Sequence, residues 1–115
     1  MSKKTANLIS ELRRGTLVLC VLSQLREQQY GYSLKERLSE RGIEVEQGTL
    51  YPLLRRLESR GLLDSEWVLT GSRPRRYYQL NATGQEVLDT LTTEWHNMVE
   101  AMNHLLGEKE NNGTD

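Results

Sequence analysis

The chain has 115 residues, of which 37% are hydrophobic and 27% charged, and its formal net charge is −1. These values are typical of a single globular domain. No apolar run approaches the roughly 20 residues that cross a bilayer, and the first residues lack the apolar core of a secretory signal. The single cysteine, Cys20, cannot form an internal disulfide, which favours a reducing compartment. We therefore expect a cytoplasmic protein with no membrane partner.

The charges are divided unevenly along the chain. Residues 1–84 contain 14 Lys and Arg against 9 Asp and Glu, a balance of +5. Residues 85–115 contain one Lys against seven acidic residues, a balance of −6. Such a division indicates either that the first part binds a polyanion or that both parts are ordinary solvated surfaces.

A first helix is predicted over residues 7–27. A stripe with a period of 3.6 runs along it, and further apolar residues make its middle apolar on most sides; the stripe is Leu8, Leu12, Leu19, Leu22 and Leu25. Such a segment must be covered on most sides, so it is either central to the domain or shared with a partner chain. Cys20 lies within it and is expected to be a core residue rather than a nucleophile.

Two shorter helices should follow. Residues 33–41 form the second, with Ser33 as N-cap, Glu36 as its capping-box partner and Gly42 as a left-handed C-cap. The third covers the stretch "GTLYPLLRRL" (residues 48–57) and ends before Gly61. Its leucines at i, i+3, i+4 and i+7 share one face; they are Leu50, Leu53, Leu54 and Leu57.

The opposite face of this third helix is polar. Gly48, Pro52, Arg55 and Ser59 project there by helical geometry, with Thr49 and Tyr51 on its flanks. Free N–H groups and the positive dipole end of such a helix suit a phosphate, and Arg55 can contact a phosphate or a guanine edge. Alternatively, Tyr51 packs on its own domain and Arg55 pairs with an acid such as Glu58 or Glu44.

The segments "LLDSEWVL" (residues 62–69) and "RRYYQL" (residues 75–80) alternate as strands do, and "TGSRP" between them contains turn-forming residues. They predict a β-hairpin with a basic tip. Three arginines near the tip are candidates for phosphate contacts, the alternative being a solvated loop; they are Arg73, Arg75 and Arg76. Because side chains alternate, Tyr77 and Tyr78 cannot both be core residues, and one should border the arginines.

A last helix begins after Asn81 or Thr83. Its apolar residues step by 3 and 4, a period of 3.5 that predicts pairing with another helix; they are Leu88, Leu91, Trp95, Met98, Met102 and Leu105. Residues 107–115 are predicted to be disordered.

Metal binding and catalysis find no support. His96, Glu100 and His104 share one helix face, but residues eight apart lie about 12 Å apart along the helix, too far for one ion in a monomer. A solvated face is the favoured interpretation. No catalytic triad order or phosphate-binding glycine loop is present, so we expect no enzyme, no cofactor and no metal.

Three helices followed by a hairpin is the order of a winged helix–turn–helix, in which the third helix enters the DNA major groove and the hairpin wing touches the backbone. The predicted class is α+β, mostly α. Residues 1–80 form the DNA-binding domain, with the first helix also in a dimer interface. Residues 81–106 form the dimerisation helix. A winged-helix module that binds another protein, through its acidic last helix, is the alternative function.

Four segments together resemble the PadR family of bacterial transcriptional regulators: "LRRGTLVLCVLSQL", "YGYSLKERL", "GTLYPLLRRLESRGLL" and "RRYYQLNATG". The similarity covers about residues 8–106, and the chain length resembles the short subfamily with a single C-terminal helix. The resemblance implies a homodimer formed by the first and last helices, which binds a pseudo-palindromic operator, usually as a repressor.

The resemblance also assigns residues. Tyr51 matches a tyrosine that contacts the DNA backbone, and the arginines 73, 75 and 76 match a basic wing. The groove-entering start of the recognition helix corresponds to Gln47, Gly48 and Thr49. Glu46 stands where many members have an N-capping Ser or Asn, and it is a poorer cap. Trp95 falls where a multidrug-binding relative has a tryptophan lining a pore at the dimer interface, so an aromatic effector could bind there. Alternatively, Trp95 only packs within the row of apolar residues along the last helix, which we call the seam.

Overall fold

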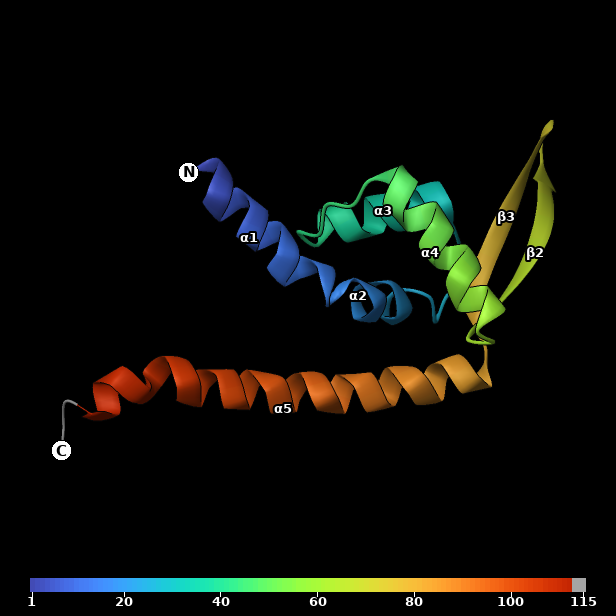
Figure 1. Ribbon diagram of the computed structural model, residues 1–115. Coiled ribbons are helices and arrows are strands. Elements are labelled where there is room, and N and C mark those ends of the chain that lie inside the picture. The colour runs from blue at the N-terminus through green and yellow to red at the C-terminus, as the bar shows by residue number, and fades with distance from the viewer. Residues whose placement is uncertain (113–115) are drawn as a thin grey trace.

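The structure, a computed structural model, describes residues 1–112 of the chain. Five helices and three short strands follow one another (Figure 1). In chain order they are α1 (Lys3–Arg14), α2 (Leu17–Ser23), β1 (Gln29–Tyr30), α3 (Gly31–Glu40), α4 (Gln47–Ser59), β2 (Leu63–Thr70), β3 (Arg73–Leu80) and α5 (Ala82–Asn112). The predicted winged helix–turn–helix with a long last helix is confirmed.

The predicted first helix is broken into α1 and α2 at Gly15 and Thr16. Thr16 donates both its backbone N–H and its hydroxyl to the carbonyl of Arg13, at 3.1 and 2.9 Å, which ends the i→i−4 ladder of α1. Glycine also has low helix propensity. As a result α1 has no buried residue and projects away from the domain, while only α2 enters the core (Figure 1).

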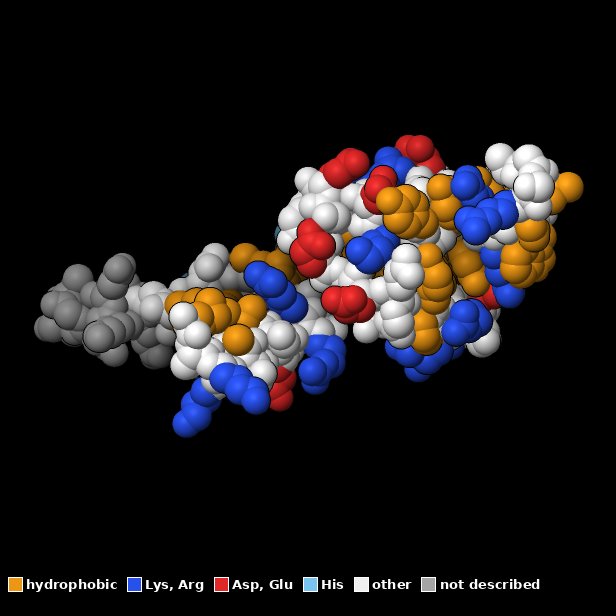
Figure 2. Space-filling model, turned by 90° about the horizontal axis from the view of Figure 1, so that it is seen from above, with side chains coloured by type: hydrophobic (Ala, Val, Ile, Leu, Met, Phe, Trp, Pro, Cys, Tyr) orange, Lys and Arg blue, Asp and Glu red, His pale blue; other side chains and the backbone are white. Residues whose placement is uncertain are grey.

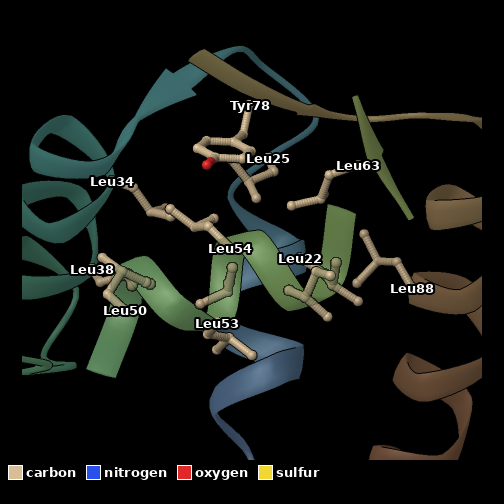
Figure 3. Packing of buried hydrophobic residues seen from close by; sticks show 12 residues of the cluster. Leu22, Leu25, Leu34, Leu38, Leu50, Leu53, Leu54, Leu63, Tyr78 and Leu88 are labelled. Carbon is tan, nitrogen blue, oxygen red and sulfur yellow. The ribbon is translucent and has the colours of Figure 1, made fainter. Parts of the chain in front are cut away.

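The core consists of leucines gathered around α4 (Figure 3). The four leucines predicted to share one face of α4 are all at most 3% exposed. They pack against α2, α3, the base of the hairpin and the start of α5 through Leu22, Leu25, Leu34, Leu38, Leu63, Tyr78 and Leu88. Each such buried side chain contributes roughly 1.5–3 kcal/mol relative to exposure. This packing fixes α4, so that its other face points outward.

Helix α3 begins earlier than the sequence predicted. Tyr30 is its N-cap, and Ser33 lies at the third helical position, where its hydroxyl accepts the backbone N–H of Tyr30 at 3.1 Å. Ser33 therefore stabilises the helix start from inside, as the glutamate of a capping box does. Gly42 has a φ of +88°, which confirms the left-handed turn after the helix.

The sheet has the order β1–β3–β2, and both pairings are antiparallel. The hairpin turn contains only Gly71 and Ser72, and Gly71 has a φ of +64°. A single positive φ at the first central residue is typical of a type II′ turn, which suits the twist of a hairpin. Strand β1 pairs Gln29 with Tyr78 and Tyr30 with Tyr77, and it was missed because two residues show no alternation.

Helix α5 starts after Asn81, one of the two caps that the sequence offered, and not at Thr83. The side chain of Asn81 accepts the backbone N–H of Gly84 at 2.8 Å and donates to the carbonyl of Gly61 at 2.9 Å. The helix runs to Asn112, so the prediction of a disordered tail from residue 107 is wrong as far as Asn112. A single glycine, Gly107, is too weak a breaker to end a helix of this length. Residues 113–115 lie outside the described part of the chain.

Within residues 1–112, no helix is both long and apolar enough to cross a membrane.

Candidate nucleic-acid interface

The start of α4 presents the three residues predicted to enter a DNA groove. Gln47, Gly48 and Thr49 are all exposed. Glu46 occupies the N-cap position and makes no side-chain capping bond, as its poor capping chemistry predicts. The N–H groups of Thr49 and Leu50 bond to the carbonyl of Glu46, which leaves those of Gln47 and Gly48 available to an acceptor such as a phosphate oxygen.

Pro52 lies in the second turn of α4, deeper than the first turn in which a proline is tolerated best. Its missing N–H would have bonded to the carbonyl of Gly48, four residues earlier. Gly48 has nothing within 4 Å of where a Cβ would stand. Gly48, which has no side chain, and Pro52, which has no N–H, thus leave an open backbone surface on the outer side of the helix.

The ring of Tyr51 rests on the backbone of Gly31 at the start of α3. A Cβ at Gly31 would collide with three ring carbons of Tyr51, so only glycine permits this position. Tyr51 is half-buried and packs partly on its own domain, while its ring also lines the surface described below. The packing interpretation is thus confirmed for one side of the ring, and the outward contact of Tyr51 stays a prediction.

The arginines of the wing differ in their surroundings. Arg73 is exposed, and the guanidinium of Arg75 lies 4.5 Å from the ring centroid of Tyr30, a cation–π contact. Tyr30 in turn packs edge-on against Tyr77, with 5.3 Å between ring centroids. These two rings hold the Arg75 side chain while leaving its positive charge without an acidic partner among residues 1–112.

Arg76 is positioned quite differently from what the sequence predicted. Its Nη2 donates to Glu58 Oε1 of α4 at 2.6 Å, and its Nε donates to the hydroxyl of Ser65 at 3.1 Å. Ser65 also donates to Glu58. Because alternation turns Arg76 towards α4, its guanidinium joins the wing to α4 through Glu58, and its predicted phosphate contact stays a prediction.

This ion pair also affects Tyr78, the buried tyrosine of β3. Burial raises the pKa of Tyr78, and the charge of Glu58 raises it further, while Arg76 and Arg55 oppose the shift. The phenol is therefore neutral in the folded protein. Glu58 is occupied by Arg76, and the structure does not pair Arg55 with Glu58 or Glu44 as the sequence had allowed.

Two adjoining grooves lie between α4 and the wing. One has a volume of about 430 Å³, and its lining includes Tyr51, Arg55, Arg75 and Trp67. The other, of about 600 Å³, extends over the start of α4 and is lined by Gln47, Tyr32 and Arg73 together with Tyr30, Tyr51, Pro74 and Arg75. Figure 2 shows basic and hydrophobic side chains lying side by side at this end of the molecule. Every predicted contact except Gly48 and Thr49 lines one of these grooves, and Arg76 lines the first of them.

Sequence reasoning missed three aromatic residues of this surface. Tyr30 holds Arg75, Trp67 lines the groove from β2, and Tyr32 donates to Glu36 at 2.7 Å, a bond that raises the pKa of Tyr32. The pairing of β1 with β3 brings Tyr30 to the wing, and a long-range pairing of two residues leaves no local signal.

A second exposed surface runs along α5. Leu88 lies in the core of its own domain at 1% exposure, so it is removed from the predicted interface, and Leu91 is half-buried beside it. The remaining seam residues are exposed: Trp95, Met98, Met102 and Leu105. A groove of about 460 Å³ lies between this seam and α1–α2, with Leu12, Val18 and Leu19 on its other side.

No group of three His, Cys, Asp or Glu side chains that could hold a metal ion occurs in the described part of the chain. His96 and His104 both lie on the exposed surface of α5.

Comparison with known proteins decides the family. The sequence profile of the transcriptional regulator PadR-like family matches residues 18–90. A transcriptional regulator of Mycobacterium tuberculosis is 38% identical over 79 residues, which are 68% of this chain and 74% of that protein. The chain belongs to the PadR-like family of transcriptional regulators.

Solved structures of PadR-like proteins share the fold. A PadR family regulator from Eggerthella lenta is 51% identical, with a TM-score of 0.85 over 89% of this chain and 91% of that chain. Bacillus subtilis PadR, solved in complex with operator DNA, is 21% identical, with a TM-score of 0.63 over 67% of this chain and 45% of that chain. The PadR-like family consists of transcription regulators and not of enzymes, which agrees with the expectation from the sequence.

Proposed function

We propose that this PadR-like regulator is a repressor that binds a pseudo-palindromic operator as a homodimer. The start of α4 enters the major groove, and the wing contacts phosphates beside it. The observation that carries this proposal is the pair of grooves between α4 and the wing, where Tyr51, Arg55, Arg73 and Arg75 line one continuous surface. Arginines without acidic partners beside aromatic rings suit a sugar–phosphate backbone.

The exposed seam of α5 supports the homodimer. Trp95, Met98, Met102 and Leu105 are each at least 40% exposed along one side of the helix. Leu8 and Leu12 of α1 are exposed as well, because the break at Gly15 separates α1 from the core. A contiguous apolar surface of this kind is costly in water and marks an interface. A second copy, related by a two-fold axis, covers both helices at once.

An aromatic effector is the third part of the proposal. Trp95 borders the apolar groove between α5 and α1–α2. In the dimer two such grooves adjoin, and a planar aromatic cation or phenolic acid stacks on the two indoles. The ligand shifts the crossing of the α5 pair and thereby the separation of the two recognition helices.

A salt titration of DNA binding tests the first part. The logarithm of the association constant for a random-sequence duplex should fall linearly with the logarithm of the salt concentration, by about 0.9 per phosphate contact. Tyr51→Ala should weaken binding while circular dichroism still shows a folded domain, with a thermal transition lowered by the loss of ring packing on Gly31. Absence of retention on duplex or heparin at low salt would instead favour a module that binds another protein.

The repressor and effector parts need separate measurements. The DNA upstream of the regulator's own gene should contain a palindrome that the protein protects from nuclease, and a reporter behind it should be silenced. Unchanged tryptophan fluorescence and unchanged operator affinity across a panel of planar aromatic cations and phenolic acids would rule out the effector site at Trp95.

A further inference from the structure

One face of the wing carries apolar side chains beyond the edge of the core. Alternation places Leu63, Ser65, Trp67 and Leu69 of β2 on the same face. At the base of the hairpin this face packs on the helices, where Leu63 is 2% exposed. Further along no helix covers it, and Trp67 and Leu69 are 66% and 71% exposed. This face of β2 is thus buried in the core at the base of the hairpin and exposed near the tip of the hairpin.

The Trp67 side chain is held in place although it is exposed. Its cross-strand partner is Arg76, whose guanidinium lies 5.8 Å from the Trp67 ring centroid and 5.5 Å from that of Tyr78. Glu58 fixes Arg76 by the ion pair to α4. A ring that is already ordered loses little conformational entropy when a partner covers it.

The charges around Trp67 identify what covers it. The ring lines the same groove as Arg55 and Arg75, and Arg73 lies nearer the tip of the same hairpin. A second copy of this face would bring like charges together, so self-association is disfavoured here. The surface combines cations with an apolar ring, and a nucleic-acid strand matches it because anionic phosphates alternate with deoxyribose rings whose C–H groups are apolar.

We propose that Trp67 is a DNA-contacting residue that packs on the deoxyribose of the strand whose phosphates Arg55 and Arg75 bind, with Leu69 extending the contact towards the tip. This inference rests on the proposed DNA binding and adds an apolar, sequence-independent contact to it. Since the contact neutralises no phosphate, it contributes to affinity and leaves the salt dependence unchanged.

The experiment measures binding to two random duplexes of equal length, one rich in A·T and one rich in G·C, over a range of salt. Trp67→Ala should raise the dissociation constant of both duplexes by the same factor, about tenfold. The slope of log K against log salt should match that of the wild type. Trp67→Phe, which keeps an apolar ring, should restore most of the affinity.

A second measurement reports on the ring itself. In protein labelled with fluorotryptophan, one of two ¹⁹F resonances belongs to Trp67 and is assigned by its absence in Trp67→Phe. That resonance should shift and become less accessible to solvent when duplex is added. Thermal unfolding of Trp67→Ala should stay close to that of the wild type, because the side chain is mostly exposed.

Each other outcome overturns the inference in a distinguishable way. Unchanged affinity of Trp67→Ala, with normal binding by the wild type, removes the contact but leaves the proposed function intact. A reduced salt slope would mean that Trp67 only positions a cation, and unequal losses on the two duplexes would mean that it reads bases. A wild type that binds neither duplex removes the proposed function itself.

Discussion

The two exposed surfaces of this regulator differ in chemistry. The surface between α4 and the wing combines arginines with aromatic rings, whereas the seam of α5 is apolar and flanked by acids such as Glu94 and Glu100. A cationic surface can be covered favourably only by anions, and an apolar seam only by another apolar surface. The uneven charge along the chain thus agrees with the proposed division of partners, in which DNA covers the cationic surface and a second copy covers the seam of α5.

The largest effect is expected when charged residues replace apolar residues of the α5 seam, which tests whether the two surfaces bind different partners. Met98→Glu together with Met102→Glu places two carboxylates in the proposed dimer interface, where burial without a partner is costly. We expect a monomer by analytical ultracentrifugation. Operator affinity should fall by about a hundredfold or more, because the two half-sites no longer bind together.

A matched control places the same two charges on the opposite side of α5. Thr93 and Asn97 are exposed and lie off the seam, so Thr93→Glu together with Asn97→Glu should remain dimeric and bind DNA with nearly the affinity of the wild type. If the methionine variant sedimented like the wild type, the proposed division of partners between the two surfaces would be wrong.

At the other surface the largest expected effect belongs to Arg75. Arg75→Ala should weaken DNA binding about tenfold, since a charge-assisted phosphate contact is lost. The salt slope should fall by about 0.9 for each half-site. Arg60→Ala removes an exposed arginine at the far end of α4 and serves as control. An unaltered slope when Arg73 and Arg75 are both replaced by alanine would remove the wing from the interface.

Much of this surface could be predicted from the sequence because its signals are local. The leucine spacing of α4 predicted which face of the helix is buried, and the opposite face was therefore expected to point outward. The hairpin followed from alternation around "TGSRP", and Asn81 was one of two candidate caps for the last helix. Each of these depends on residues a few positions apart, which is the range over which periodicity and turn chemistry act.

The features that were missed depend on contacts between distant residues. Arg75 and Arg76 are neighbours of the same type, yet one is held by Tyr30 and the other by Glu58, eighteen residues away. Only the sheet register decides which arginine faces α4. The burial of Leu88 likewise depends on how α5 packs on the domain, and the heptad pattern alone could not separate a core position from an interface position.

The different partners of Arg75 and Arg76 predict a smaller effect, on stability and not on salt dependence. Arg76→Met should lower the free energy of unfolding by about 1 kcal/mol, as expected for a partly exposed ion pair discounted for solvent screening. Denaturant unfolding measures this loss. The salt slope of DNA binding should stay that of the wild type, in contrast to Arg75→Ala. If Arg76→Met instead reduced the salt slope of DNA binding and left the free energy of unfolding unchanged, Arg76 would be a phosphate contact and not a structural ion pair.

The smallest expected effect has opposite signs for folding and binding. Gly48 is helical, and nothing lies within 4 Å of its missing Cβ, so Gly48→Ala should raise the free energy of unfolding by about 0.5 kcal/mol. The added methyl group stands on the outer side of α4, where we propose that the DNA backbone approaches most closely. Duplex affinity should therefore fall while thermal stability rises. If both quantities rose together, the open space beside Gly48 would remain open in the complex, and the groove-entering surface would have to lie further along the helix, nearer to Tyr51 and Arg55.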